Sequence, residues 1–166
     1  FLDYIAGNAL TNETKTALVE GVADACANVG CALLGGETAD MPDVYAPGDF
    51  DLAGFIVGVV ERDKIIDGSK VAEGDVLLAL ASSGLHTNGY TLARKVLSIA
   101  DGETPSETRQ RLEERPPVLN GATVEDKLLA THLPYHKAVS PVLDKLHGIA
   151  HITGGGYPEN VARVLP

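Results

Sequence analysis

Three glycine-rich segments, each placed directly after an apolar run, constrain the fold of this chain more than any other feature. They read LGGET at 34–38, SSGLHTNG at 82–89 and HITGGG at 151–156, and the last two lead into expected helices. Glycines permit the sharp turn that ends a strand, and the bare backbone N–H groups at such a turn bind phosphate oxygens well. Each segment alone is explained as well by a tight turn, but three together predict that at least one contacts a ligand.

Apolar strands alternate with amphipathic helices along the chain, which predicts an α/β or α+β fold. The expected strands are 1–4, 51–61, 76–81 and 149–152, and the expected helices are 13–29, 90–100, 134–146 and a last one from about 158. Asn12 or Thr11 would cap the first helix and Gly30 would end it, while Pro141 would kink or split the third. The polar segments 40–49 and 101–121 are expected to be a loop and a surface excursion.

The strand over 51–61 is unusual, because Gly54 and Gly58 alternate with apolar residues. Glycine inside a strand marks bending or a close backbone approach, as in a barrel or a tight interface. The polar, turn-rich segment that follows predicts a domain boundary near 63–68. We therefore expect two domains, residues 1–65 and residues 66–166.

The charge balance and the apolar pattern argue against two classes of partner. The chain has 13 basic and 23 acidic residues, a formal net charge of −10, and the basic residues are scattered. A nucleic-acid surface needs a basic stripe, so no nucleic-acid partner is expected. No apolar run approaches the roughly 18 residues of a membrane span, so no membrane partner is expected either. Cys26 and Cys31 lack the further ligands of a zinc site, and we expect buried free thiols in a reducing cytoplasm.

The single methionine, Met41, is internal, and the chain opens on FLDY, which reads like the middle of a strand. These features predict a piece of a longer protein, incomplete at both ends. A mature product whose leader has been removed is the alternative.

Glu37, His86 and Asn88 are the side chains best suited to chemistry. The chain has no P-loop, no GxGxxG dinucleotide fingerprint and no GxSxG nucleophile elbow. Glu37 follows two glycines at a strand end and could hold magnesium bound to a nucleotide, although a surface acid or a helix cap explains it too. His86 and Asn88 could bind phosphate or move a proton, but Asn88 suits equally well the N-cap of the next helix.

The other histidines are weaker candidates. His151 lies in an apolar run and is read as a core histidine in preference to a ligand. His132, His136 and His147 have no acidic partner at ligand spacing, so no metal role is expected for them.

Five segments in this order and spacing resemble the aminoimidazole ribonucleotide synthetase family, the phosphoribosylformylglycinamidine cyclo-ligases of purine biosynthesis. They are FLDY at 1–4, LGGETADMP at 34–42, DLAGF at 51–55, SSGLHTNGY at 82–90 and HITGGG at 151–156. The resemblance implies two α/β domains and a homodimer built through a barrel shared by N-terminal-domain strands. It implies that the chain covers about half of such an enzyme, and the glycine-rich strand 51–61 would suit that barrel.

The resemblance also implies the reaction, which is ATP-dependent ring closure of formylglycinamidine ribonucleotide to aminoimidazole ribonucleotide. In this reaction the formamide oxygen is phosphorylated and an amidine nitrogen then displaces phosphate. Glu37 would bind Mg²⁺-ATP, and His86 and Asn88 would contact phosphate or reacting groups as catalytic residues. The glycine-rich segments would supply the other contacts to the nucleotide, through Gly35, Gly36, Thr38, Ser83, Gly84, Gly154 and Gly155.

Departures from the family pattern keep alternatives open. Asp40 stands where the family usually has Glu, and THLP at 131–134 replaces a Pro-Thr-Arg-like stretch that offers an arginine. The family's Asp-Gly-Val-Gly-Thr-Lys stretch does not occur in this sequence. The alternatives are a related ATP-dependent enzyme, of the selenophosphate synthetase or thiamine-monophosphate kinase type, or an inert fragment that acts only as a dimerisation unit.

Overall fold

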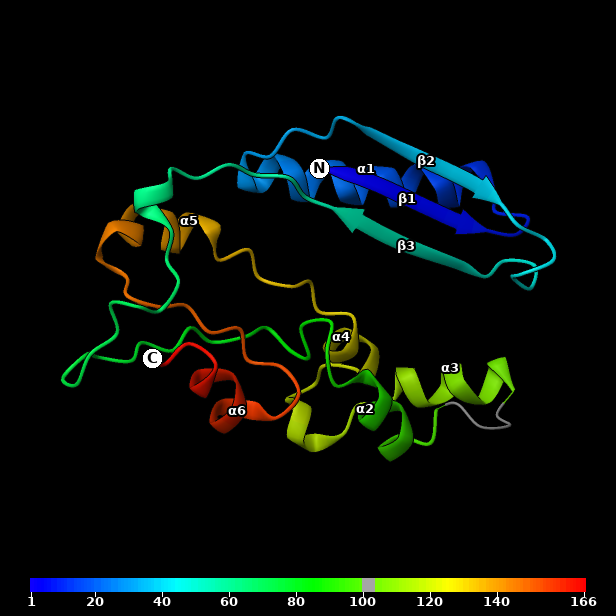
Figure 1. Ribbon diagram of the computed structural model, residues 1–166. Helices are drawn as coiled ribbons and strands as arrows, with labels where there is room; N and C mark the ends of the chain where they lie inside the picture. Colours follow the sequence, from blue (N-terminus) through cyan, green and yellow to red (C-terminus); the bar gives the residue numbers. More distant parts are fainter. Residues whose placement is uncertain (100–103) are drawn as a thin grey trace. The chain divides into compact units, whose positions relative to one another are not determined.

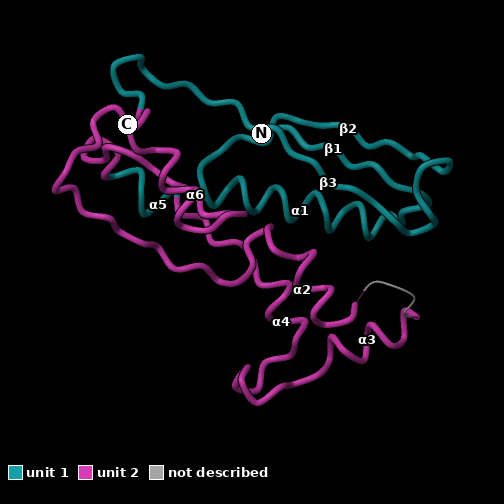
Figure 2. The backbone as a smooth tube through the Cα atoms, turned by 60° about the horizontal axis from the view of Figure 1, so that its bottom comes forward, with its two compact units in different colours: residues 1–65, 136–141 teal, residues 66–135, 142–166 magenta. Residues whose placement is uncertain are grey.

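The computed structural model describes residues 1–99 and 104–166, and these form two compact units (Figure 2). Unit 1 consists of residues 1–65 and 136–141, and unit 2 of residues 66–135 and 142–166. Compactness alone does not define a domain, so the predicted domains 1–65 and 66–166 remain a prediction.

Unit 1 is a three-stranded sheet with one long helix. Along the chain come β1 (Leu2–Gly7), α1 (Asn12–Val29), β2 (Gly35–Asp40) and β3 (Phe50–Phe55). The strand order is β2-β1-β3, with β2 parallel and β3 antiparallel to the central β1, and α1 runs along one face of the sheet (Figure 1). Ile5 and Ala6 of β1 are fully buried, so the core of this unit lies at the centre of the sheet. The mixed architecture confirms the predicted α/β class.

Both ends of α1 lie where the sequence predicts them. The Thr11 hydroxyl accepts a hydrogen bond from the Thr14 N–H at 3.2 Å, and this satisfies one of the free donors of the first turn. At the other end Gly30 adopts a left-handed conformation, with φ of 71°, that closes the helix. Between the caps, Cys26 is buried as a free thiol.

The segment around Gly36 is a strand, so the predicted turn at 35–38 is wrong. Gly36 pairs with Asp3, and a Cβ atom at position 36 would overlap the Asp3 backbone oxygen and carboxylate. The glycine therefore serves close strand approach rather than chain reversal. Gly54 pairs with Asp3 from the other side, beneath the ring of Phe1, which fits the close approach predicted for it.

The predicted strand over 51–61 is too long. Strand β3 ends at Phe55, and residues 56–60 continue without a paired strand among the described residues. Val57 is 81% exposed, so this apolar segment has no covering layer in the described structure.

Unit 2 consists of short helices. They are α2 (Tyr90–Val96), α3 (Pro105–Glu113), α4 (Val124–Leu128) and α6 (Gly156–Ala162), with a 3₁₀ turn at Pro117–Leu119. The predicted helix over 90–100 is shorter than expected, and its last residue lies outside the described residues. The predicted helix over 134–146 is split into α5 (His136–Val139), which belongs to unit 1, and a 3₁₀ segment, Ser140–Lys145, as Pro141 led us to expect.

Two predicted strands of unit 2, 76–81 and 149–152, have no regular secondary structure and form no ladder. A strand needs a hydrogen-bonded neighbour, and the described residues supply none to either segment. The polar segment 101–121, which we expected to be a surface excursion, contains helix α3. The start of α3 is fixed by a reciprocal pair of hydrogen bonds between Thr104 and Glu107. Residues 101–103 of the segment lie outside the described ranges.

None of the helices in the described ranges combines the length and the apolar character needed to cross a membrane.

Candidate functional site

The predicted site residues fall into three groups on three different elements. One group is on β2 in unit 1, a second is the loop before α2 in unit 2, and a third is the turn before α6, also in unit 2. Each group has its own local geometry.

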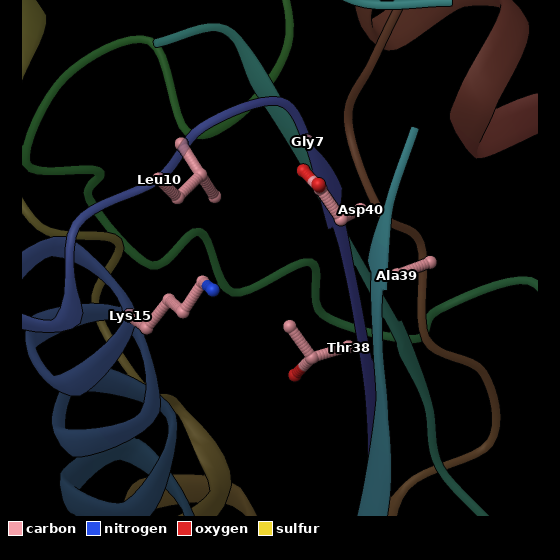
Figure 3. A pocket seen from close by; sticks show the side chains of 6 residues that line it. All are labelled: Gly7, Leu10, Lys15, Thr38, Ala39 and Asp40. Atoms are coloured by element: carbon pink, nitrogen blue, oxygen red, sulfur yellow. The ribbon is translucent and has the colours of Figure 1, made fainter. Parts of the chain in front are cut away.

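On β2, alternate side chains lie on opposite faces of the sheet. Thr38 and Asp40 lie on the side of the strand that faces α1, and Ala39 points away from it (Figure 3). Strand alternation places Glu37 with Ala39 on the face away from α1. Glu37 is exposed, and its Oε1 accepts a hydrogen bond from the Thr38 N–H at 3.2 Å. The carboxylate is therefore free to accept further donors or a cation.

A small cavity lies between β2 and the start of α1. Its volume is about 70 Å³, and it is lined by Gly7, Leu10, Lys15, Thr38, Ala39 and Asp40 (Figure 3). Nucleotide-sized pockets start at about 300 Å³, so this cavity does not enclose a nucleotide by itself.

Lys15 is a polar residue of this region that the sequence analysis missed. Its side chain extends from α1 towards the cavity beside Thr38 (Figure 3). The only signal in the sequence is that Lys15 is the single basic residue of α1. Lys15 lies opposite β2 because α1 packs along the sheet. A local sequence pattern cannot predict which strand a helix residue will face.

The loop before α2 is held in an unusual backbone conformation. His86 and Thr87 have φ values of 41° and 69°, in the left-handed region that non-glycine residues rarely adopt. Such outliers persist where surrounding contacts enforce them, and they concentrate at functional sites. The predicted loop at 82–89 is confirmed, and its strain is concentrated at the two residues before Asn88.

Four side chains around this loop form what we call the His86 cluster, namely Ser83, His86, His132 and Tyr135. The backbone N–H of Ser83 donates to His86 Nε2 at 2.8 Å, and the Ser83 hydroxyl lies 2.6 Å from the same nitrogen. The His132 ring stacks on His86 with 4.0 Å between centroids. The Tyr135 hydroxyl lies 3.4 Å from His86 Nδ1 and donates to the carbonyl of Ala81 at 2.7 Å.

No pattern in the sequence marks His132 and Tyr135 as neighbours of His86. They lie more than 40 positions along the chain, and only folding brings the two segments together. Burial lowers the pKa of His132, and the nearby charges of His86 and His151 lower it further. A lowered pKa favours the neutral imidazole at neutral pH.

Asn88 does not cap α2. The N-cap of this helix is Gly89, in a left-handed conformation and with no side-chain cap, so the capping role considered for Asn88 is wrong. The Asn88 amide donates instead to the His86 carbonyl at 3.3 Å and is otherwise exposed. Gly84 lies close to the Lys127 carbonyl, where a Cβ atom would come within 3.2 Å.

The turn before α6 is organised by one buried side chain that the sequence analysis missed. Asn160 is only 4% exposed, and its amide donates to the carbonyls of Gly156 at 2.8 Å and Gly154 at 3.1 Å. Its carbonyl accepts from the Thr153 hydroxyl at 3.1 Å. Gly154 has open space around it, and Gly155 has a φ of 90°. Nearby His151 is exposed, so its interpretation as a core histidine is wrong.

The described residues contain no group of three or more His, Cys, Asp or Glu side chains placed to bind a metal ion. Any cation held by Glu37 would therefore need most of its ligands from elsewhere, such as nucleotide phosphates and water.

Comparison with known proteins agrees with the motifs in the sequence. The family models described as AIR synthase related protein, N-terminal domain, and AIR synthase related protein, C-terminal domain, match residues 1–60 and 72–166. A phosphoribosylformylglycinamidine cyclo-ligase of Symbiobacterium thermophilum is 49% identical over 168 residues. The match takes in all of this chain and 46% of that relative, so the chain spans about half the length of the curated relative it matches. The resemblance predicted from the sequence is confirmed, and the chain belongs to the AIR synthase related family.

Proposed function

We propose that this protein takes part in purine biosynthesis as a cyclo-ligase, closing the ring of formylglycinamidine ribonucleotide to give aminoimidazole ribonucleotide at the expense of ATP. The observation that supports this most is the 49% identity, over the whole chain, to a relative named phosphoribosylformylglycinamidine cyclo-ligase. The motifs on β2, in the loop before α2 and in the turn before α6 all fall inside this match.

The proposed reaction has two steps. The formamide oxygen attacks the γ-phosphorus of ATP, ADP leaves, and the poor leaving group becomes a phosphate ester. An amidine nitrogen then attacks the formyl carbon, the carbon–oxygen bond breaks, and inorganic phosphate departs while the nitrogen loses a proton. The protein's part in such a sequence is to position the reacting groups and to stabilise developing charge.

Glu37 is the residue that we propose for the magnesium ion of Mg²⁺-ATP. Magnesium bound to a nucleotide takes one or two carboxylates and fills its other positions with phosphates and water, so a single exposed carboxylate fits its needs. Glu37 is exposed and accepts only one hydrogen bond among the described residues, from its neighbour Thr38. When bound, the cation would neutralise charge on the phosphates.

The neighbouring backbone is proposed to contact the nucleotide and the substrate. Around Glu37 these residues are Gly35, Gly36 and Thr38, and in unit 2 they are Ser83, Gly84, Gly154 and Gly155. His86 and Asn88 of unit 2 are proposed to contact the phosphate or the reacting groups of the substrate. The open space around Gly154 and the exposed Asn88 amide support these assignments.

A homodimer and a cytoplasmic location are part of the same proposal. β3 is an edge strand of the sheet, and the side chain of Phe55 at its end is 62% exposed. An edge strand with exposed apolar side chains can pair with a strand of a second copy of the chain. Cys26 and Cys31 are free thiols, which suits a reducing compartment.

The test uses the complete protein with ATP and formylglycinamidine ribonucleotide. We expect aminoimidazole ribonucleotide to form, with one ADP released for each ring closed and no ADP without the formamidine substrate. ATP consumption with selenide or thiamine monophosphate in its place would identify a related enzyme type. A complete protein that consumes no ATP with any of the three substrates would refute the proposed activity.

A further inference from the structure

The structure assigns His86 a positioning role: we propose that its imidazole stays neutral, carries its proton on Nδ1, and ties the loop 82–89 to the segment 131–135. The positioning role of His86 adds to the proposed function. Of the two tests below, only the activity test depends on that function. The positioning role distinguishes His86 from a residue that carries protons to or from the substrate.

The partners of Nε2 determine its protonation. The backbone N–H of Ser83 donates to this nitrogen at 2.8 Å, and a backbone N–H can only donate. The N–H of Leu133 points to the same nitrogen from 3.5 Å. Because both backbone groups can only donate, Nε2 offers them a lone pair, and a proton at this position would meet the hydrogen of the Ser83 N–H. The Ser83 hydroxyl lies 2.6 Å from Nε2 and 2.7 Å from the Thr131 carbonyl, and in this assignment its single hydrogen goes to Nε2.

The partners of Nδ1 complete the assignment. The Tyr135 hydroxyl donates its hydrogen to the Ala81 carbonyl at 2.7 Å, so its oxygen is left with lone pairs. That oxygen lies 3.4 Å from His86 Nδ1 and can accept a hydrogen bond from it. A proton on Nδ1 thus gives a continuous series of donors and acceptors from the ring to Tyr135 and on to the backbone.

The titratable groups near the ring are two histidines and a tyrosine. His132 stacks on one side of it, His151 lies near enough to His132 to influence its charge, and Tyr135 is at its edge. Among the described residues, none supplies a carboxylate that hydrogen-bonds to His86. A histidine that cycles its proton during catalysis is usually oriented by such a carboxylate, which stabilises the imidazolium.

The same contacts explain why the loop keeps its strained backbone. The Ser83 N–H and the Tyr135 hydroxyl hold the imidazole from two sides, and the ring enforces the left-handed conformation at its own Cα and at Thr87. The exposed side chains of Thr87 and Asn88 are then presented at a fixed place on the loop.

The first test measures the tautomer directly, by ¹⁵N NMR of the imidazole nitrogens in this chain at neutral pH. We expect His86 Nδ1 to resonate as a protonated nitrogen and Nε2 as an unprotonated one. In the Tyr135→Phe variant Nδ1 loses its acceptor, and the resonances should move towards a mixture of tautomers. A protonated Nε2 in the unsubstituted chain, or a doubly protonated ring, overturns the proposal whatever the protein catalyses.

The second test compares two substitutions in the complete protein. Glutamine can place an acceptor near the position of Nε2 but cannot shuttle protons, so His86→Gln should keep turnover within about tenfold while His86→Ala loses far more. Loss of a proton carrier would cost about 10²–10⁴-fold in both variants. Equal loss in both, or no loss in either, overturns the positioning role. His136→Gln, in α5 and outside the cluster, is the matched control and should not change turnover.

Discussion

At the scale of single residues, some side chains near the glycine-rich segments make many hydrogen bonds, and others are exposed and make few. Asn160 and His86 each take part in at least four hydrogen bonds to nearby groups. Glu37 and Asn88 are exposed and have few partners. The sequence indicates the free residues, because they stand beside glycines, but it does not indicate Asn160, whose partners become neighbours only when α6 folds back on the turn.

Glu37→Gln tests the proposed magnesium contact in the complete protein. Removing one charge-assisted contact costs roughly 1.5–3 kcal/mol, so we expect the affinity for Mg²⁺-ATP to fall about tenfold to a hundredfold. Isothermal titration calorimetry measures this affinity directly. The same substitution at exposed Glu20 of α1 is the control and should leave the affinity unchanged. Equal affinity in the Glu37 variant and the parent protein would remove Glu37 from the site.

His132 should titrate below the ordinary histidine value. Burial, together with the charges of His86 and His151, lowers its pKa below 6.5 in the folded chain. The unfolded chain therefore binds the proton more readily, so stability should decline as the pH falls below 6.5 and level off below the folded pKa. Proton NMR of the His132 ring measures the midpoint, and a midpoint at or above 6.5 would contradict the stacked arrangement.

At the scale of elements, local signals predicted helix ends well, while pairing partners were harder to predict. The ends of α1 follow from Thr11 and Gly30, which act within a few residues of themselves. The strand expected at 76–81 has the right apolar pattern, but a ladder requires a partner that the sequence pattern cannot name. At β2 the two glycines suggested a turn, although the close approach of Asp3 is what requires Gly36.

Thr11→Ala removes the hydroxyl that caps α1. Loss of an N-cap of this kind costs about 1 kcal/mol of stability. Urea denaturation followed by circular dichroism should show this loss as a lower midpoint with an unchanged slope. Thr16→Ala, in the exposed interior of the same helix, is the control and should stay within about 0.5 kcal/mol of the parent. Equal effects of the two substitutions would show that the cap contributes nothing specific.

Gly36→Ala tests the close contact between β1 and β2. The added methyl group would overlap the Asp3 backbone, and relieving such an overlap costs about 1–3 kcal/mol. The variant should unfold at a lower urea concentration than the parent chain. Gly58 has nothing within 4 Å of its missing Cβ, so Gly58→Ala should be neutral or stabilising by up to about 1 kcal/mol. If Gly36→Ala is as stable as Gly58→Ala, the register of β2 on β1 is wrong.

At the scale of the whole molecule, the order of five short motifs was enough to identify the family, and both family models and the cyclo-ligase relative agree with it. The candidate site was predictable only in part. Glu37, His86 and Asn88 could be named as candidates because their motifs are contiguous in the sequence, and their roles stay predictions. Lys15, His132 and Tyr135 could not, because their places beside the motif residues depend on how helices and extended segments pack.

The most direct test of the proposed function follows the formamide oxygen through the reaction. The complete protein would be given ATP and formylglycinamidine ribonucleotide labelled with ¹⁸O at the formyl group, and the phosphate would be examined by mass spectrometry. If the oxygen is phosphorylated and then displaced by nitrogen, each ring closed should give one labelled inorganic phosphate. Ring closure with unlabelled phosphate would contradict the phosphorylation step, and the absence of ring closure would contradict the cyclo-ligase function itself.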